Sequence, residues 1–544
     1  MKKGRFPKLP KLPKLPWSRR AVPAAERKTR NARVPKGLPE SSWLEEPLRS
    51  SLEDNRVAMR DIFKECSDIV YRELMISPER KGLLAYFEGT VKSEDLQDHI
   101  LRPVILGMML KDPEVNGKLE PLDETRISMS QTKTMDEWKQ VSAAILDGNA
   151  ALFVDGTARA YIFSAKGGVR RGVEEPQTEA VIRGPREGFT ETLRVNTALL
   201  RFKLKTSKLK MHSMTLGTET QTSVVLTYVE GIIDPKLVED VKKRLSDIKI
   251  DGVLETGYIE ELIEDHPYSP FPQMEYTERP DTVTAQLLEG RFAIFVDGTP
   301  FALIGPVTMW QMMQASEDYY ERFFISNMVR WIRFLFLIMA LFLPALYVAV
   351  TTYHHDMLPT TLILSIAAAR ESIPFPALVE ALMMEISFEA LREAGIRLPK
   401  TVGQAVSILG ALVIGQAAVQ AGIVSAPIVI VVSLTGIASF TIPRFNFAIT
   451  VRLLRFPIML MAGLFGLFGI IIATTLIATH LTKLTSFGVP YMSGYSPYNH
   501  MDQKDIIVRA PWWKMTKRPS WIGKDNNKRA KKEMNGSPKT EEGW

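Results

Sequence analysis

Four glutamates recur at short intervals between two long uncharged stretches in the C-terminal half of this chain. They are Glu380, Glu385, Glu389 and Glu393. Spacings of four or five residues place their side chains along one broad side of a helix. In an oligomer, rings of such carboxylates would collect cations at the mouth of a pore, as acidic rings do in cation channels.

The same segment also fits a solvated amphipathic helix with internal ion pairs. Arg392 follows Glu389 by three residues, and Arg397 follows the next glutamate by four. Both offsets place opposite charges next to each other on a helix surface. We therefore hold two hypotheses for the amphipathic helix predicted over residues 377–397, an ion-paired helix or the mouth or gate of a pore. The candidate mouth and gating residues are Glu380, Glu385, Glu389, Glu393 and Arg392.

A stretch rich in small residues follows this helix. No charge occurs from Thr401 to Pro443, and small residues recur there every fourth position. Such a face usually lets helices pack closely, but it can also line a narrow aqueous path. The glutamines of this stretch favour the aqueous path, because an amide in lipid must find a partner or water. The candidate pore-lining residues are Gly403, Gln404, Ser407, Gly410, Ala411 and Gly415.

Elsewhere the residue types do not form a site for catalysis. Histidines are scattered, and the adjacent side chains of His354, His355 and Asp356 are poorly placed to converge on one metal ion. Cys66 is the single cysteine, which excludes a disulfide within the chain. We expect no enzyme, no metal site and no cofactor.

The character of the sequence changes at Arg333, where charged segments typical of water-soluble protein give way to apolar runs typical of a membrane domain. A run of about 20 apolar residues matches the hydrocarbon thickness of a bilayer, so residues 326–485 are predicted to form an all-α polytopic membrane domain. Four full crossings would leave Arg444 on the outer side, against the usual charge bias. The predicted spans are 334–353, 402–420, 425–442 and 456–479, with a half-helix over 357–369 and the amphipathic helix over 377–397.

Upstream, the composition predicts a cytoplasmic α+β or α/β region in two subdomains. Residues 1–50 read as a basic, Pro-rich, disordered leader, because Lys-Leu-Pro repeats remove backbone donors. Residues 51–140 are predicted to be mainly helical, and residues 141–325 to form an α/β subdomain. Residues 486–544 read as a basic cytoplasmic tail. The net charge of +7 lies mostly at the two ends, which favours contact with membrane lipid rather than with nucleic acid.

One sequence motif occurs twice within residues 141–325. Residues 152–161 read LFVDGTARAY, and residues 294–303 read IFVDGTPFAL. Asp-Gly between two apolar runs predicts a β-hairpin, since the turn requires positive φ at its centre. The two copies are either related strand pairs of one sheet or the result of a duplication.

Several long motifs resemble those of one known family. They are GPREGFTE at Gly184, GYIEELIEDHPYSPFPQ at Gly257, YTERPD at Tyr276, EGRFAIFVDGTPFALI at Glu289, PFPALVEALMMEISFEALREAGIRLPK at Pro374, GQAVSILGALVIGQAAVQAGIVS at Gly403 and RAPWW at Arg509. Together they resemble the A subunit of the GerA family of bacterial spore germinant receptors, over about Leu52 to Trp513.

This resemblance implies a protein of the inner spore membrane. The four predicted crossings make it multi-pass and put both termini in the cytoplasm. The resemblance also implies a transporter-like B subunit and a lipoprotein C subunit as partners. The A subunit would form a homo-oligomer whose membrane part is a nutrient-gated channel for monovalent cations. Two alternatives stay open: a non-conducting scaffold or signalling subunit, and a related sporulation membrane protein that is not itself a nutrient receptor.

Overall fold

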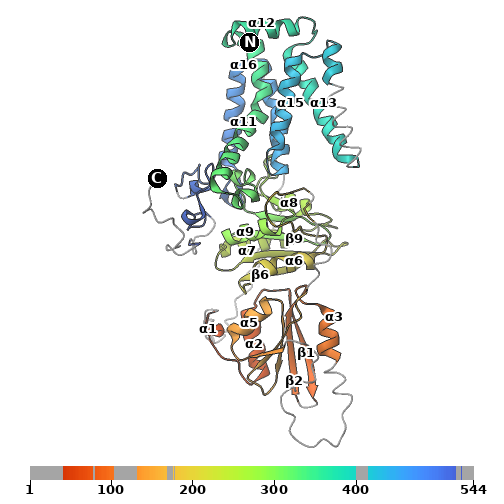
Figure 1. The fold of residues 1–544 in the computed structure, drawn as a ribbon, viewed down its shortest axis with the longest axis vertical. Coiled ribbons are helices and arrows are strands. Elements are labelled where there is room, and N and C mark those ends of the chain that lie inside the picture. Colours follow the sequence, from red (N-terminus) through yellow and green to blue (C-terminus); the bar gives the residue numbers. More distant parts are fainter. Residues whose placement is uncertain are drawn as a thin grey trace, which may run out of the picture.

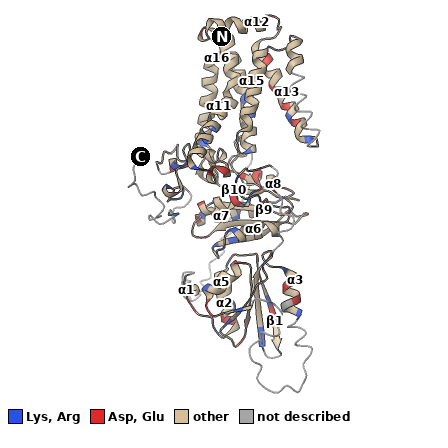
Figure 2. Cartoon of the chain, viewed as in Figure 1, with Lys and Arg blue, Asp and Glu red and all other residues tan. Residues whose placement is uncertain are grey.

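The computed structural model of the chain has a mixed α/β N-terminal region followed by a helical C-terminal part (Figure 1). It describes residues 41–77, 80–102, 132–167, 175–176, 178–399, 415–500, 502–521 and 528–529. Two α/β layers are stacked along the long axis, and the helical part continues beyond the second of them. Charged residues are frequent in the α/β layers and sparse in the helical part apart from α13 (Figure 2).

The first layer is a five-stranded antiparallel sheet of order β1-β2-β4-β5-β3. Its strands are β1 (Ile69–Ser77), β2 (Arg80–Phe87), β3 (Thr132–Met135), β4 (Ala150–Val154) and β5 (Ala160–Phe163), and its helices are α1 (Ser41–Leu44), α2 (Leu52–Ile62), α3 (Ser93–Leu96), the π-helix η1 (Gln97–Leu101) and α5 (Trp138–Leu146). The prediction of a mainly helical subdomain over 51–140 was wrong. Among the described residues of this range, β1, β2 and β3 occur beside the helices, and β2 pairs with β4, so one sheet extends across the boundary expected near residue 140.

The second layer repeats this arrangement, with the strand order β6-β7-β9-β10-β8. Its strands are β6 (Leu209–Leu216), β7 (Thr222–Val229), β8 (Glu275–Thr277), β9 (Phe292–Val296) and β10 (Ala302–Gly305), and its helices are α6 (Leu193–Lys203), α7 (Pro235–Ser246), α8 (Thr256–Ile263), α9 (Pro280–Glu289) and α10 (Met309–Met312). Apolar side chains of α7 and α8 pack on one face of the sheet, and those of α6 and α9 pack on the other.

Equivalent hydrogen bonds show that the two layers are copies of one unit, which we name the first repeat (residues 41–167) and the second repeat (residues 178–305). Asp155 of the β4–β5 turn accepts from the first amide of α2, Leu52 N, at 3.0 Å. Asp297 of the β9–β10 turn accepts from the first amide of α6, Leu193 N, at 3.1 Å. The duplicated phrase therefore reflects a duplication, and both aspartates cap a neighbouring helix.

The helical part consists of α11 (Phe323–Tyr353), α12 (Thr360–Arg370), α13 (Ala377–Arg397), α15 (Ala426–Phe440) and α16 (Phe445–Lys483), with the short 3₁₀ helices η3 (Ser316–Tyr319) before α11 and η4 (His355–Met357) after it. Among the described residues, α11 and α16 are the two helices long and apolar enough to cross a membrane. Most of the predicted span 402–420 lies outside the described residues.

Helix α16 reverses direction at Gly466, whose φ of 62° interrupts the helical backbone. The ring of Phe271 is 6.4 Å from that of Phe447, near the start of α16, and 5.9 Å from that of His480, near its end. A straight helix would separate these two residues by roughly 50 Å. Residues 445–465 and 467–483 are thus two antiparallel arms, and the prediction of a single crossing over 456–479 was wrong.

The chain after α16 packs back onto the α/β part. It forms the short strands β11 (Thr485–Ser486) and β12 (Val489–Pro490) and the 3₁₀ helices η5 (Asp502–Lys504) and η6 (Trp512–Lys514). Ser486 Oγ donates to Gln273 O at 2.7 Å, and Phe487 joins the apolar core between the sheet and α7. This segment connects the helical part to the second repeat.

Candidate functional site: buried ion pairs of the helical part and its base

Helix α13 carries the four predicted glutamates, and the first three contact other helices. Glu380 has no exposed surface. Its carboxylate accepts from Arg370 Nε at 3.1 Å and from the backbone amide of Ser425 at 3.0 Å. Because Ser425 is the N-cap of α15, this carboxylate faces the positive end of a helix dipole. It ties α13 to the end of α12 and the start of α15.

Glu385 forms an ion pair with Arg455 in the centre of the helices. Their side chains are 1% and 2% exposed. Arg455 Nε also donates to the backbone carbonyl of Ala340 in α11 at 2.8 Å. Within the described part of the chain, Glu385 Oε1 and Arg455 Nη2 have no hydrogen-bond partner. A buried pair with unsatisfied atoms contributes little net stability, yet each partner depends strongly on the other.

Glu389 and Arg392 form the next contacts along α13. Glu389 is 3.5 Å from Arg392 on the same helix and 3.3 Å from Arg452 of α16. Arg392 Nη2 donates to Ser439 Oγ of α15 at 3.1 Å, and its guanidinium lies 4.5 Å from the centre of the Phe440 ring. The predicted pairing within the helix is present, but it belongs to a network that joins three helices.

Glu393 ends the series with an exposed ion pair. Arg397 Nη2 lies 2.6 Å from its Oε1, and the two side chains are 77% and 59% exposed for Arg397 and Glu393. Such a pair is worth at most about 1 kcal/mol. The ion-paired helix is therefore present in α13, although two of its four carboxylates are buried between helices rather than solvated. The proposed pore-mouth role of these residues is not tested by this geometry.

Most predicted pore-lining residues, Gly403, Gln404, Ser407, Gly410 and Ala411, lie outside the described residues. Gly415 is described and buried. A side chain added at Gly415 would meet Val429 of α15 at 3.5 Å, so this position lies against a neighbouring helix.

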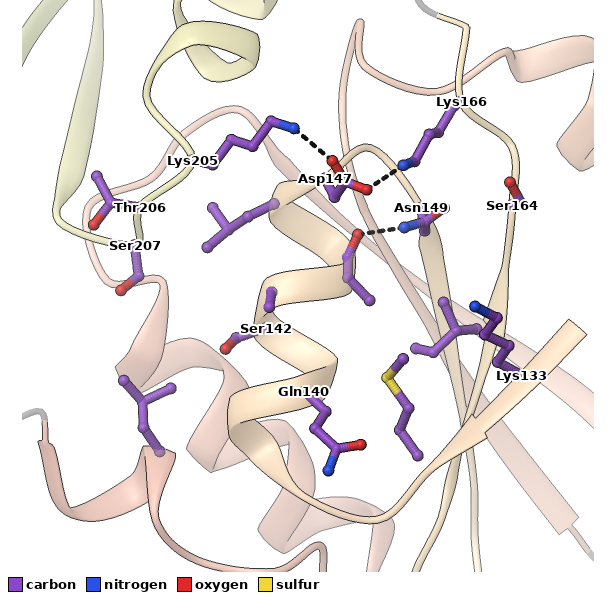
Figure 3. A pocket seen from close by; sticks show the side chains of 16 residues that line it. Lys133, Gln140, Ser142, Asp147, Asn149, Ser164, Lys166, Lys205, Thr206 and Ser207 are labelled. Atoms are coloured by element: carbon purple, nitrogen blue, oxygen red, sulfur yellow. Dashed lines mark hydrogen bonds and ion pairs between the residues drawn. The ribbon is translucent and has the colours of Figure 1, made fainter.

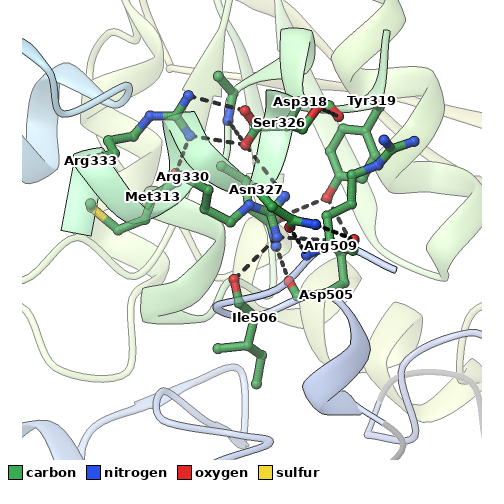
Figure 4. A network of polar contacts seen from close by, with 12 residues as sticks. Met313, Asp318, Tyr319, Ser326, Asn327, Arg330, Arg333, Asp505, Ile506 and Arg509 are labelled. Atoms are coloured by element: carbon green, nitrogen blue, oxygen red, sulfur yellow. Dashed lines mark hydrogen bonds and ion pairs between the residues drawn. The ribbon is translucent and has the colours of Figure 1, made fainter. Parts of the chain in front are cut away.

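A second polar network fixes the base of α11 (Figure 4). Arg333 donates to both carboxylate oxygens of Asp318, at 2.9 and 3.0 Å. Arg330 lies 3.3 Å from Asp318 and 3.0 Å from Asp505, which belongs to the segment after α16. Burial raises the pKa of Asp505 to about 6, although Arg330 and Tyr319 favour its charged form. The first and last parts of the helical region are thus locked together at its base.

The second repeat contacts α16 through a buried arginine and a loop. Arg444, just before α16, pairs with Glu179 at 2.6 Å and with Glu275 of β8. Burial raises the pKa of Glu275, and Arg444 opposes that shift. Phe271 packs between the two arms of α16, and its neighbour Ser269 lies 2.8 Å from His480 Nε2. Since Arg444 lies against the α/β part, the prediction that four crossings leave it on the far side was wrong.

Comparison with known proteins identifies the family of this chain. The family described as Bacillus/Clostridium GerA spore germination protein matches residues 57–521. The chain belongs to the GerA spore germination protein family. The predicted resemblance is confirmed.

Several curated relatives match this GerA-family chain over most of their length. Spore germination protein KA of Bacillus subtilis (strain 168) is 44% identical over 91% of both chains. Spore germination protein GerLA of Bacillus cereus is 39% identical over 87% of this chain and 96% of the relative. A third relative, the uncharacterized membrane protein YfkQ of Bacillus subtilis (strain 168), is 58% identical over 91% and 96%.

A solved structure is also similar to part of the GerA-family chain. It is the crystal structure of the N-terminal domain of the A subunit of the Bacillus megaterium spore germinant receptor GerK3, with 35% sequence identity. The match covers 48% of this chain and 97% of that one, with a TM-score of 0.38.

Sequence reasoning missed the residues that join the α/β part to the helices of this GerA-family chain. Asp318, Asp505 and Glu275 belong to no local charge pattern that predicts their partners, which lie at least 12 residues away in the sequence. One available signal was the pair of arginines at 330 and 333, placed just where the apolar run begins. Arginines at that position can pair inside the protein as well as face lipid headgroups.

Proposed function

We propose that this chain is the A-type membrane subunit of a spore germinant receptor, and that it oligomerises into a nutrient-gated cation channel that triggers germination. The receptor role is supported by membership of the GerA family over residues 57–521. The observation that carries the channel role is the Glu385–Arg455 pair, which lies buried among apolar helices. Ionisable residues inside a membrane domain are costly and usually mark an ion path or its gate.

The proposed orientation follows from the charges at the helix ends. Arg330, Arg333, Arg444 and Lys483 all belong to the ends of α11 and α16 that face the α/β part. The positive-inside bias then assigns the α/β part and the segment after α16 to the cytoplasm, which in a spore is the core side of the inner membrane. The two arms of α16 would each cross this membrane.

In the proposed channel, the small-residue stretch containing Gly403, Ser407 and Ala411 lines the path. Helix α13 forms the mouth or gate, because its carboxylates connect it to α12, α15 and α16. Arg455, the partner of Glu385, extends this contact to α11. The Phe271 loop and Arg444 would transmit a change in the second repeat to α16. A transporter-like B subunit and a lipoprotein C subunit would complete the receptor, with the B subunit holding the nutrient.

A bulky side chain facing the axis should block this path. We expect spores with Ser407→Trp or Ala411→Trp to release monovalent cations much more slowly after nutrient addition, at equal protein level. Ile430→Trp is the matched control, because Ile430 lies in α15, outside the small-residue stretch, and its side chain is 68% exposed. Normal cation release in both pore variants would make the pore assignment wrong.

A non-receptor role within the same family is the alternative with a specific observation behind it. The relative YfkQ, 58% identical, carries the name of an uncharacterized membrane protein rather than that of a germination protein. Deletion of the gene separates the two roles. A receptor subunit predicts loss of germination with at least one nutrient, whereas unchanged germination with every nutrient tested would favour the alternative. If the chain is a non-conducting scaffold, spores that lack it would germinate abnormally, but the purified protein would conduct no cations.

A further inference from the structure

Each repeat carries a cleft beside the same helix–strand turn, and among the described residues only the cleft of the second repeat is filled by another segment of the chain. In each repeat the cleft lies beside the turn between the helix and the strand that precede the Asp-Gly hairpin. Asp147, Gly148 and Asn149 form this turn in the first repeat, and Glu289, Gly290 and Arg291 form it in the second. Both glycines have positive φ, 86° and 99°, so each turn passes through the left-handed region at its glycine.

In the second repeat, the segment after α16 occupies this cleft. Arg529 pairs with Glu289, and the Arg291 guanidinium lies 5.3 Å from the centre of the Trp521 ring. Arg518 Nε donates to the backbone carbonyl of Leu288 at 2.7 Å. The space left is about 90 Å³. At this position, the repeat therefore binds a polypeptide segment through charged and aromatic side chains.

In the first repeat, the equivalent cleft has a volume of about 750 Å³, and among the described residues no segment fills it (Figure 3). Its size falls in the range of ligand sites in proteins. Figure 3 shows polar side chains around it, from the helix–strand turn, the end of β5 and the loop between α6 and β6. That loop supplies Lys205, Thr206 and Ser207, so the cleft is bordered by both repeats.

The charges of this first-repeat cleft favour an acidic occupant. Its charged lining residues are Lys133, Lys166, Lys205 and Asp147, so three positive charges and one negative charge leave +2. Lys166 and Lys205 share the Asp147 carboxylate, with Lys205 Nζ 2.6 Å from Asp147 Oδ1. One carboxylate therefore serves two ammonium groups, and the Lys133 side chain is exposed. These lysines are available to further carboxylates.

The borders of the cleft are held in fixed relative positions. Arg201 of α6 pairs with Asp68 of the first repeat through two contacts, at 2.6 and 2.8 Å, and the two side chains are 1% and 7% exposed. Met211 of β6 also exchanges backbone hydrogen bonds with the loop before β1, accepting from Ser67 N at 2.9 Å and donating to Glu65 O at 3.0 Å. An occupant would thus meet a preformed site, which lowers the ordering cost of binding.

We propose that the first-repeat cleft is a docking site for an acidic polypeptide segment of a partner protein. It is the counterpart of the cleft that the chain's own C-terminal segment occupies in the second repeat. The occupant places carboxylates near Lys133, Lys166 and Lys205 and accepts hydrogen bonds from the hydroxyl groups of Ser164 and Ser207. An apolar floor that includes Met135 and Ile162 holds its side chains.

Binding of a probe peptide to the purified full-length chain in detergent tests this proposal. The probe is a fluorescein-labelled peptide of alternating glutamate and serine, followed by anisotropy. Lys166→Glu/Lys205→Glu should weaken binding by about tenfold or more. Lys64→Glu/Lys236→Glu makes the same charge change at exposed positions of the two repeats outside the cleft, and it should change binding less than about twofold.

A variant without a charge change guards against a purely long-range effect. Ser164→Trp should fill the cleft and weaken binding, and thermal unfolding curves of every variant confirm that the chain is folded. The proposal would be overturned if Lys166→Glu/Lys205→Glu and Lys64→Glu/Lys236→Glu weakened peptide binding equally. It would also be overturned if Ser164→Trp bound the peptide as the unaltered chain does, or if the unaltered chain did not bind it. Displacement of the probe by inorganic phosphate at matching charge concentration would also overturn it, since the cleft would then take small oxyanions rather than a polypeptide.

Discussion

Loss of one partner of the buried Glu385–Arg455 pair should lower the free energy of unfolding strongly. Arg455→Met would leave the Glu385 carboxylate buried without its counter-ion and would also free the Ala340 carbonyl. Removing one partner of such a buried pair costs about 3–5 kcal/mol. Replacing both partners, as in Glu385→Leu/Arg455→Met, removes the unpaired charge and should cost less than either single change.

Thermal unfolding of the purified chain in detergent measures these costs. Each kcal/mol lowers the Tm of a domain of 150–250 residues by roughly 2–4 °C, so Arg455→Met should lower the Tm by about 10 °C. Arg397→Met is the matched control, because its pair with Glu393 is exposed and its loss should cost at most about 1 kcal/mol. Equally small decreases in Tm for Arg455→Met and Arg397→Met would contradict this prediction, since the Glu385–Arg455 pair would then be as hydrated as the exposed Glu393–Arg397 pair.

Three further predictions concern the α/β part and its contact with the helices. Phe271→Ala should lower the free energy of unfolding by about 3–5 kcal/mol, because the buried ring fills the space between the arms of α16. Tyr268→Ala, at a fully exposed position of the same loop, should change it little in the same unfolding assay. Burial, together with neighbouring carboxylates, raises the pKa of Glu260 from 4.5 to about 8. Between these two pH values the Glu260 carboxyl keeps its proton in the folded chain and has lost it in the unfolded chain. The free energy of unfolding should therefore fall as the pH rises from about 5 to 8. A plot of Tm against pH should be flatter for Glu260→Gln than for the unaltered chain, and a steeper plot for this variant would contradict the prediction. Arg201→Met leaves its buried carboxylate partner unpaired and should cost about 3–5 kcal/mol, against about 1 kcal/mol or less for Arg194→Met, whose ion pair is half exposed; limited proteolysis between the repeats reports the same difference.

Local signals predicted the hairpins of this fold well. Asp-Gly flanked by apolar runs identified both turns, because that turn type constrains the residues at its centre. The sequence could not decide between one sheet and two, since strand pairing depends on partners far along the chain. The strand order of the two sheets, and the equivalent caps made by Asp155 and Asp297, provided that answer.

The reversal of α16 was missed because glycine in an apolar run usually indicates close helix packing. Gly463, Gly466 and Gly469 were all compatible with one packed helix, and only the backbone of Gly466 adopts positive φ. A signal was nevertheless present. The prediction of four crossings placed Arg444 on the unfavourable side of the membrane, and this conflict indicated an error in the number of crossings, because the contacts of Arg444 with Glu179 and Glu275 put it on the side of the α/β part.

The ion pairs of α13 were predicted in part. Partners three or four residues apart follow from helix geometry, so the pairs of Glu389 and Glu393 could be anticipated. The partners of Glu380 and Glu385 come from α12, α15 and α16, and no local pattern encodes those contacts. Burial therefore separates the four glutamates into two groups that look alike in the sequence.

Cation flux through the purified, reconstituted protein is the direct test of the proposed channel. Proteoliposomes loaded with potassium and containing the chain together with the proposed B and C subunits should release the cation when a nutrient is added. Release should be lost with Ala411→Trp and retained with Ile430→Trp. No nutrient-dependent release from the unaltered complex, in vesicles that retain folded protein, would contradict the account and leave the chain a non-conducting subunit.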